Sequence, residues 1–489
     1  MKVSAIAIAG VLALASAASA QPGRSSFTPA LWKDCSGGDC TAGEAFRYLL
    51  WSRASDKNVC QSFFQSALVP SQAILACRAL IPAAAGPIDD LGVVNGLMQF
   101  VNTQTNTFPL PWGSSGAGFS FVVDSSNGMP LLKARSFGPM FAERPQTNGR
   151  GAWNVSFSLQ RTVWNSIDGT PLNRIVAEES RFLDSSACQP GNCLSTRWTA
   201  EVSLVTTDAV VGASYGLTDR VDVGVTVPVL LVNVSGRAYT AGAFTSNADV
   251  GVTTASSVAT GNGHSFGVGD ISLRGKVALK GSRTGNETAS LNDDSHWYVG
   301  GSGELRIPSG NPDAMTGTGR AALKGTVLVS HVSNPMALRQ LEVHFNGGFV
   351  WAGSGISISG VGFLPGTEQQ HADYNIKPSN EVNISAGVDT ALTERVTIMA
   401  DYLGRGLLNS AEYSAVPFQL PDVNKRFSQP FLTPKSLVTL HLLTCGAKVH
   451  LGDKWVVSGS ILFSPADHGL KPGVTPVIGL ERQFRRWAE

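Results

Sequence analysis

The most constraining feature of this sequence is a period of two that recurs through most of the chain. In RVDVGVTVPVLLV, residues 220–232, every odd position from Val221 to Leu231 is apolar, whereas the even positions include Asp222 and Thr226. This spacing predicts a strand with one apolar face and one mixed face. The apolar face can lie against a protein core or against lipid, and the rest of the chain must decide between the two.

The first 20 residues indicate that the chain is exported. MKVSAIAIAGVLALASAASA has one lysine, an apolar run and a final Ala-Ser-Ala, which predicts a secretory signal peptide over residues 1–20 that is cleaved before Gln21. No later segment reaches the roughly 18 to 20 uninterrupted apolar residues of a membrane helix. If the mature chain enters a membrane, strands must cross it.

The composition favours β structure and excludes some partners. Charged residues make up 15% of the chain, the net charge is +1, and there are 53 glycines. The near-neutral charge argues against a nucleic acid partner. Low charge with abundant Gly, Val and Ser suits a β protein and does not suit a disordered chain.

The seven cysteines fit an oxidising compartment. Four lie near the N-terminus, Cys35, Cys40, Cys60 and Cys77, and they can pair as disulfides in three ways, which the sequence leaves open; a zinc site made by the same four is the alternative. A disulfide between Cys188 and Cys193 would close one small loop. The seventh, Cys445, lies within a predicted strand as a small apolar residue.

The organisation changes near residue 115. Residues 42–101 space apolar residues at three and four, which predicts short helices. We therefore expect a disulfide-pinned periplasmic helical segment over residues 21–114, because so small a core needs covalent support. Its position before the first strand raises the hypothesis that it plugs the domain over residues 115–489.

Residues 115–489 read as a series of about 14 strands, with 12 as the other possible count. Most are longer than the roughly 9 to 11 residues that a tilted strand needs to cross a bilayer. The connections alternate between short turns and long loops, which is typical of outer-membrane barrels. The short turns are at 217–220, 393–395 and 452–454, and the long loops are at about 235–267, 353–379 and 409–434.

The two faces of these strands are consistent with a closed antiparallel transmembrane β-barrel. A soluble sandwich would expose the charged face and pack the apolar rows inside, whereas a barrel turns the apolar rows to lipid and the charges to the lumen. Strand edges cannot stay unpaired in hydrocarbon, so the sheet must close. The charges predicted to line the lumen are Arg274, Lys276, Glu304, Arg306, Lys324, Glu342, His344, Asp389, Asp401 and Arg405.

The last strand predicts a partner during assembly. Ile478, Leu480 and Phe484 share one face and place an aromatic residue near the C-terminus. This is the pattern of barrel-assembly signals, so the barrel-assembly machinery and outer-membrane lipid are expected partners, beside a small-molecule solute.

Several stretches resemble a family of bacterial outer-membrane barrels grouped with phenol-degradation pathways, which are distantly similar to long-chain fatty-acid channels. They include SFGPMFAERPQTNGRGAWNVSFSLQRT (136–162), YGLTDRVDVGVTVPVL (215–230) and AGVDTALTERVTIMADYLGR (386–405). The resemblance implies a Gram-negative outer-membrane location and a transporter-like, porin-like function. Its motifs are turn and strand patterns, so they identify the fold better than the cargo.

Two other functions have to be weighed. The sequence HVSN, with His331, Ser333 and Asn334, resembles the motif of outer-membrane lipid-acyl hydrolases, in which His activates Ser. However, Ser-Asn-Pro is also ordinary turn chemistry, and strand counting places it at the short-turn end. A structural or adhesion barrel is the other alternative. We predict a non-enzymatic barrel without cofactor or metal, for passive uptake of small molecules, with hydrophobic or aromatic solutes as candidates.

Overall fold

The computed structural model describes most of the chain after the first 34 residues. The described residues are 35–51, 91–111, 119–123, 130–134, 140–182, 192–246, 252–280, 295–333, 341–363, 370–393, 395–420, 425–451 and 455–485. The predicted signal peptide and Cys60, Cys77 and Cys188 lie outside these ranges. The division of the chain at residues 20 and 114 stays a prediction.

Twelve antiparallel strands close into one barrel, which confirms the predicted fold class at the lower of the two strand counts. The first barrel strand, β3, pairs with the last, β18, from Ala152 opposite Arg485 to Gln160 opposite Val477. The other edge of β3 pairs with β6. In chain order the barrel strands are β3 (Ala152–Ile167), β6 (Asn192–Gly216), β7 (Val221–Ser246), β9 (Ile271–Lys280), β10 (Ser295–Ile307), β11 (Ala322–Ser333), β12 (Leu341–Phe363), β13 (Gln370–Ala391), β14 (Val396–Leu420), β15 (Lys425–Leu451), β16 (Trp455–Phe463) and β18 (Thr475–Arg485).

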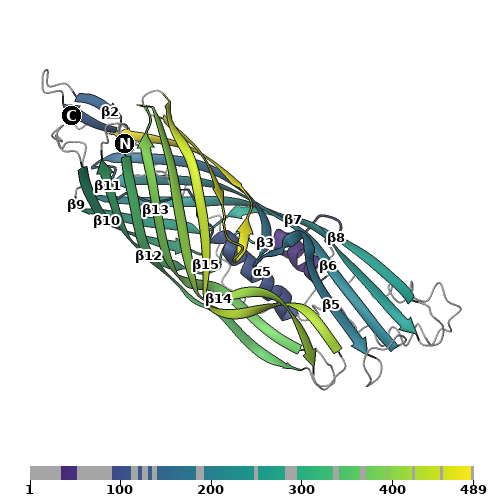
Figure 1. Cartoon of the computed structure of the whole chain (residues 1–489). Coiled ribbons are helices and arrows are strands. Elements are labelled where there is room, and N and C mark those ends of the chain that lie inside the picture. Colours follow the sequence, from purple (N-terminus) through teal and green to yellow (C-terminus); the bar gives the residue numbers. More distant parts are fainter. Residues whose placement is uncertain are drawn as a thin grey trace.

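The two ends of the barrel differ. The end that contains the turn at residues 217–220 and the end of β18 is called the turn end here, and the opposite one the loop end. At the loop end several strands continue far beyond their neighbours, as Figure 1 shows. For example, β15 has 27 residues and β16 has nine. Four additional strands belong to the sheet: β4 (Thr170–Pro171), β5 (Ile175–Phe182), β8 (Val252–Val268) and β17 (Leu470–Pro472), with a 3₁₀ turn at Leu172–Arg174.

The segments predicted as long loops are partly strand. β7 continues to Ser246 and pairs with β8 inside the stretch 235–267, and β14 pairs with β15 throughout most of 409–434. The stretch 235–267 is rich in Ser, Thr, Gly and Ala and lacks an apolar row, and the stretch 409–434 is interrupted by four prolines. Because the alternation weakens there, the sequence pattern did not reveal strands that extend beyond the lipid-facing band.

The outer face of the barrel is an apolar band. The predicted outward residues are exposed to the surroundings of the barrel, while the residues between them are buried, such as Glu342 and His344 on β12. Monomeric soluble proteins rarely expose so large a contiguous apolar surface. The closed wall and this band define a barrel that spans a membrane. Exposed members include Phe157, Leu273, Leu279, Trp297, Leu305, Val327, Val343, Phe345, Ile384 and Ile478.

A charge in the middle of this band should strongly destabilise the barrel. Val327 lies near the middle of β11 and is 59% exposed. We expect Val327→Arg to lower the free energy of unfolding from lipid by about 2–4 kcal/mol, the cost of Arg on a lipid-facing position at the bilayer midplane. Urea titration of folding into liposomes measures this change. Val327→Leu, which changes size without charge, is the control, and equal stability of the two variants would contradict the lipid-facing assignment.

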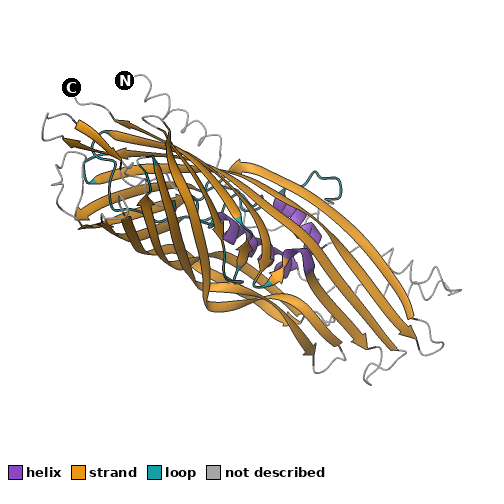
Figure 2. Ribbon diagram, turned by 45° about the horizontal axis from the view of Figure 1, so that its top comes forward, coloured by secondary structure: helices purple, strands orange, loops and turns teal. Residues whose placement is uncertain are grey.

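Two helices lie in the space that the barrel wall encloses, not outside it (Figure 2). They are α2 (Ala42–Trp51) and α5 (Leu91–Asn106). Neither described helix is long and apolar enough to cross a membrane. A two-stranded hairpin of β1 (Phe119–Val123) and β2 (Pro130–Ala134) stands apart from the barrel sheet.

Helix α2 explains why β7 becomes apolar on both faces. Beyond Thr226 the inward positions of β7 change to Leu230, Val232 and Val234, and these side chains join Phe46 and Leu49 of α2 in one buried core. The outward face of the same strand continues the lipid-facing row. One strand of the wall is therefore apolar toward lipid on one side and toward the helix on the other.

The start of α2 is fixed by local chemistry. The Thr41 hydroxyl accepts a hydrogen bond from the Glu44 amide at 3.2 Å, and the Glu44 carboxylate accepts one from the Thr41 amide at 2.8 Å. This reciprocal pair is a capping box. A disulfide between Cys35 and Cys40 precedes it, which assigns one pairing among the four N-terminal cysteines.

Candidate functional site

Helix α5 crosses the interior of the barrel and is hydrogen-bonded to several parts of the wall. The Gln99 side chain accepts a bond from the Ile376 amide of β13 at 2.8 Å. The Gln104 side chain accepts one from the Leu470 amide of β17 at 2.6 Å. Asn102 donates to the carbonyl of Gly317, in the connection between β10 and β11, at 3.0 Å. The amide side chains of α5 therefore attach the helix across the lumen.

A second part of the chain occupies the lumen nearer the turn end. Residues 140–151, called the lumen segment here, come directly before the first barrel strand. The amides of Met140 and Phe141 both donate to the Asp401 carboxylate of β14 at 3.3 Å. At the other end of the segment, the Asn148 amide donates to Asp222 of β7 at 2.9 Å. Because β7 and β14 are not neighbours in the wall, the segment runs across the lumen.

Charges on the wall bind the middle of the lumen segment. Arg144 pairs with Glu342 of β12 at 3.4 Å, and both side chains are almost completely buried. Gln146 donates to the same carboxylate at 2.9 Å. Lys276 of β9 donates to the carbonyls of Arg144 and Gln146. These charge-assisted bonds are the strong kind, so the wall carboxylates and lysine position the segment.

Next to this pair lies a buried hydrogen-bonded row across three strands. His344 of β12 has one ring nitrogen 2.9 Å from the Ser330 hydroxyl of β11 and the other bonded to the Asp389 carboxylate of β13. All three side chains are at most 1% exposed. Since both ring nitrogens are occupied and the hydroxyl is enclosed in the wall, the row ties strands together.

A chamber lies inside the barrel between α5 and the lumen segment. Its volume is about 170 Å³. Its walls come from several barrel strands, residues 105–110 bound it on the side of α5, and Phe141 and Glu143 bound it on the side of the lumen segment. An engineered cavity of about 150 Å³ is large enough to bind benzene. The chamber is therefore large enough for a small aromatic molecule.

The chamber contains charges of both signs, and most are paired. Arg405 donates to both oxygens of Glu381, at 2.7 and 3.1 Å, and also to the Thr107 hydroxyl that follows α5, at 3.0 Å. Glu304 lies opposite Lys324 in the register of β10 and β11. The paired charges make the chamber polar without giving it a large net charge.

The ten charged residues predicted from the alternation lie on the inner side of the wall. Arg274, Lys276, Glu342 and Asp401 contact the lumen segment. Glu304, Arg306, Lys324 and Arg405 line the chamber, and His344 and Asp389 form the buried row. Their role in transport stays a prediction.

The sequence pattern missed the groups that occupy the lumen. The lumen segment has no regular alternation of apolar and polar residues, so its sequence does not predict a place inside the barrel. The polar side chains of α5 were missed because helical periodicity shows where a helix is and not what surrounds it. Asp208, which also lines the chamber, stands on the inward side of a predicted strand, so its alternation could have revealed it.

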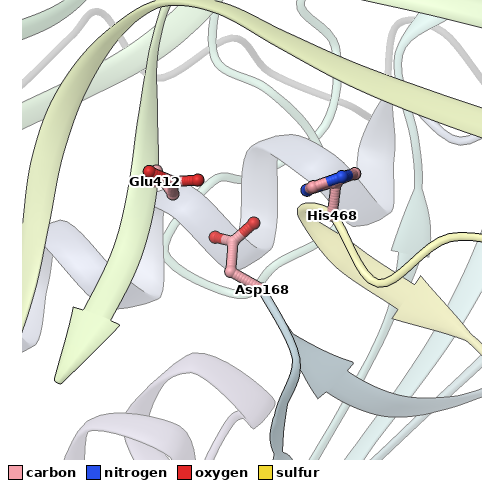
Figure 3. Close-up of side chains that lie close together, drawn as sticks. All are labelled: Asp168, Glu412 and His468. Carbon is pink, nitrogen blue, oxygen red and sulfur yellow. The ribbon is translucent and has the colours of Figure 1, made fainter.

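One cluster near helix α5 has donor atoms suited to a metal ion. Asp168, Glu412 and His468 come from three distant parts of the chain and converge near the loop end, with donor atoms within 4.8 Å of one another (Figure 3). The Asp168 carboxylate accepts a bond from the Tyr413 amide at 2.7 Å, and Glu412 pairs with Lys435 at 2.7 Å. Burial raises the pKa of the Asp168 carboxyl, and the backbone bonds from Tyr413 and Gly469 partly oppose this. These contacts give the cluster a structural role in joining three segments.

His331 and Ser333 of the HVSN motif lie on the outer side of the wall, away from the chamber, and Asn334 lies outside the described residues. His331 and Ser333 are on β11, whose end at Ser333 pairs with the start of β12 at the turn end. The ring of His331 packs against the exposed Trp297, with 4.5 Å between ring centroids. His331 and Ser333 therefore do not face the chamber.

The fold and the interior define a membrane-spanning β-barrel whose lumen is narrowed by its own chain, as in bacterial outer-membrane barrels. No family model matches the sequence, and no curated protein matches it. Among solved structures, the chain is similar to an outer-membrane channel from Pseudomonas putida F1, with 12% identity, a TM-score of 0.36 and coverage of 68% of this chain and 96% of that one.

Two other solved structures are similar at the same level. One is a mutant of the monoaromatic hydrocarbon channel TodX, with 11% identity, a TM-score of 0.30 and coverage of 77% of this chain and 100% of that one. The other is a FadL homologue from Pseudomonas aeruginosa, with 10% identity, a TM-score of 0.26 and coverage of 76% and 97%. All three TM-scores are below 0.5, so the family resemblance seen in the sequence stays a prediction.

Proposed function

We propose that this protein is an outer-membrane barrel through which small molecules diffuse passively, and that the chamber is a binding site along their path. One observation supports this most directly: a chamber of about 170 Å³ inside a closed, lipid-facing wall, between two stretches of chain that narrow the lumen. A barrel of eight strands is filled by its own side chains, and barrels of 16 to 18 strands leave an open channel. With twelve strands, the inserted chain determines what can pass.

The solutes that suit this path are small and partly apolar. Phe108 and Phe141 line the chamber together with Leu230 and Leu403, while the charged groups are mostly paired with one another. Ligand pockets commonly combine apolar walls with a few placed polar groups. Small aromatic molecules are therefore better candidates than large sugars, which exceed the chamber in size.

The test is permeation into proteoliposomes that contain the purified barrel. We expect one-ring solutes that cross lipid slowly, such as the zwitterion phenylalanine, to enter faster than into protein-free liposomes, and trisaccharides to be excluded. Planar-bilayer recording of the same preparation should show small conductance steps. Entry rates equal to those of empty liposomes, together with no conductance, would refute the proposal and favour a structural or adhesion barrel.

A further inference from the structure

One carboxylate of the chamber differs from all the others that line it. Asp208 of β6 lines the chamber and is only 4% exposed. Within the described part of the chain, no Lys, Arg or His nitrogen lies within 4.0 Å of its oxygens, and the residue opposite it on the neighbouring β3 is the uncharged Gln160. A buried carboxylate without a cation is costly, because burial removes its solvation.

The other chamber carboxylates have partners. Glu143 pairs with Arg274, and Glu381 pairs with Arg405. Asp270 accepts bonds from the Thr318 amide at 2.9 Å and from the Gly310 amide at 3.1 Å. Glu304 faces Lys324 and Arg274 across its two neighbouring strands. Asp208 is therefore the chamber carboxylate whose charge is left for a ligand to neutralise.

The surroundings of Asp208 are apolar and aromatic. Leu230 lies directly opposite it in the register of β6 and β7, and Pro228 follows at the next inward position. Two residues before Asp208, the Thr206 hydroxyl accepts a hydrogen bond from the Trp164 indole at 3.3 Å. Trp164 in turn packs edge-to-face against Phe108, with 5.2 Å between ring centroids. Aromatic faces and an unpaired carboxylate are the groups that bind organic ammonium ions in proteins.

We propose that the chamber binds a small organic cation, an ammonium group on an aromatic or short aliphatic body, with Asp208 as its counter-ion. The ammonium group would lie at Asp208, and the body would lie against the apolar wall formed by Leu230 and Phe108. The volume of about 170 Å³ suits a one-ring amine. This inference rests on the proposed function, since it names the class of solute that the path retains.

The test compares three ligands of nearly equal size that differ in charge: benzylammonium, benzyl alcohol and benzoate. Binding to the detergent-solubilised full-length barrel is measured by calorimetry at neutral pH. We expect benzylammonium to bind more tightly than the other two. In Asp208→Asn, which keeps the side-chain volume, its affinity should fall by about 10- to 100-fold, as expected for loss of a charge-assisted bond, while that of benzyl alcohol stays unchanged.

Two variants serve as controls. Glu304→Gln changes the charge of the chamber by the same amount but leaves Asp208 in place, so its effect on benzylammonium should be much smaller. Leu230→Lys places an ammonium group opposite Asp208, so it should abolish benzylammonium binding even if Asp208→Asn does not fold. Equal affinities for the three ligands in the natural protein, or an Asp208→Asn variant that retains the preference, would overturn the inference.

Permeation and binding together separate this inference from the proposed function. If phenylalanine enters proteoliposomes faster than protein-free liposomes while benzylammonium binds no more tightly than benzyl alcohol, the transport proposal stands and the cation site is wrong. If phenylalanine enters no faster than into protein-free liposomes, the transport proposal itself fails.

Discussion

Reversing the charge of Arg144 is expected to open the lumen. In Arg144→Glu a carboxylate replaces the guanidinium that lies 3.4 Å from Glu342, at a place where both side chains are almost completely buried. Breaking a buried pair of this kind costs about 3–5 kcal/mol, because the remaining charge stays without solvent. The barrel strands do not depend on this pair, so the lumen segment should leave the lumen while the wall remains closed. Single-channel conductance in planar bilayers should rise several-fold.

A double variant distinguishes release of the segment from general damage to the barrel. Arg144→Glu combined with Glu342→Arg restores a pair of opposite charges, so conductance should return toward that of the natural protein. The mobility of unheated protein in SDS gels reports whether the wall is intact. If Arg144→Glu folds normally and conducts no more than the natural barrel, the lumen segment does not restrict the path.

Replacing Gly263 is expected to detach α2 from the wall. A Cβ at Gly263 of β8 would lie 2.6 Å from the Ala45 Cβ and would also meet the backbone oxygens of Thr41 and Cys40. Backbone atoms cannot move aside cheaply, so Gly263→Leu should separate α2 from β8. Phe46 and Leu49 would then lose their buried contacts, and deletion of a single such side chain already costs about 2–5 kcal/mol. Limited proteolysis should cleave within residues 42–51 of the variant.

The matched control is another glycine on a strand of the same barrel. A Cβ at Gly275 of β9 would meet nothing within 4 Å, so Gly275→Leu should leave residues 42–51 as resistant to protease as they are in the natural protein. If both variants are equally resistant, α2 is not seated on β8 in solution.

The alternation of apolar and polar residues was sufficient to predict the barrel wall. It assigned Leu273, Val343 and Phe345 to the outer face and Glu342 and His344 to the inner one, and the structure agrees. This works because in a membrane barrel each face of a strand has a uniform environment, lipid outside and lumen inside. The same rule predicted closure, since a strand edge in lipid would leave backbone groups unpaired.

The pattern could not predict features whose environment is not uniform. The sequence predicts more than twelve strands because β1 and β2 alternate like barrel strands, yet they pair only with each other. The extra strands β5 and β8 alternate weakly, so the sequence predicts longer loops than the structure has. The lumen segment has no regular secondary structure over residues 142–148. Its place depends on pairings such as Arg144 with Glu342, 198 residues apart, which no local pattern encodes.

The position of the N-terminal part of the chain has a consequence for biogenesis. Helices α2 and α5 and the lumen segment all precede β3 in the chain, yet they lie within the wall that β3 to β18 later form (Figure 2). The barrel closes only when the last strand, β18, pairs with the first, β3. The leading residues must therefore either be enclosed as this seam forms or enter the closed barrel through one of its ends.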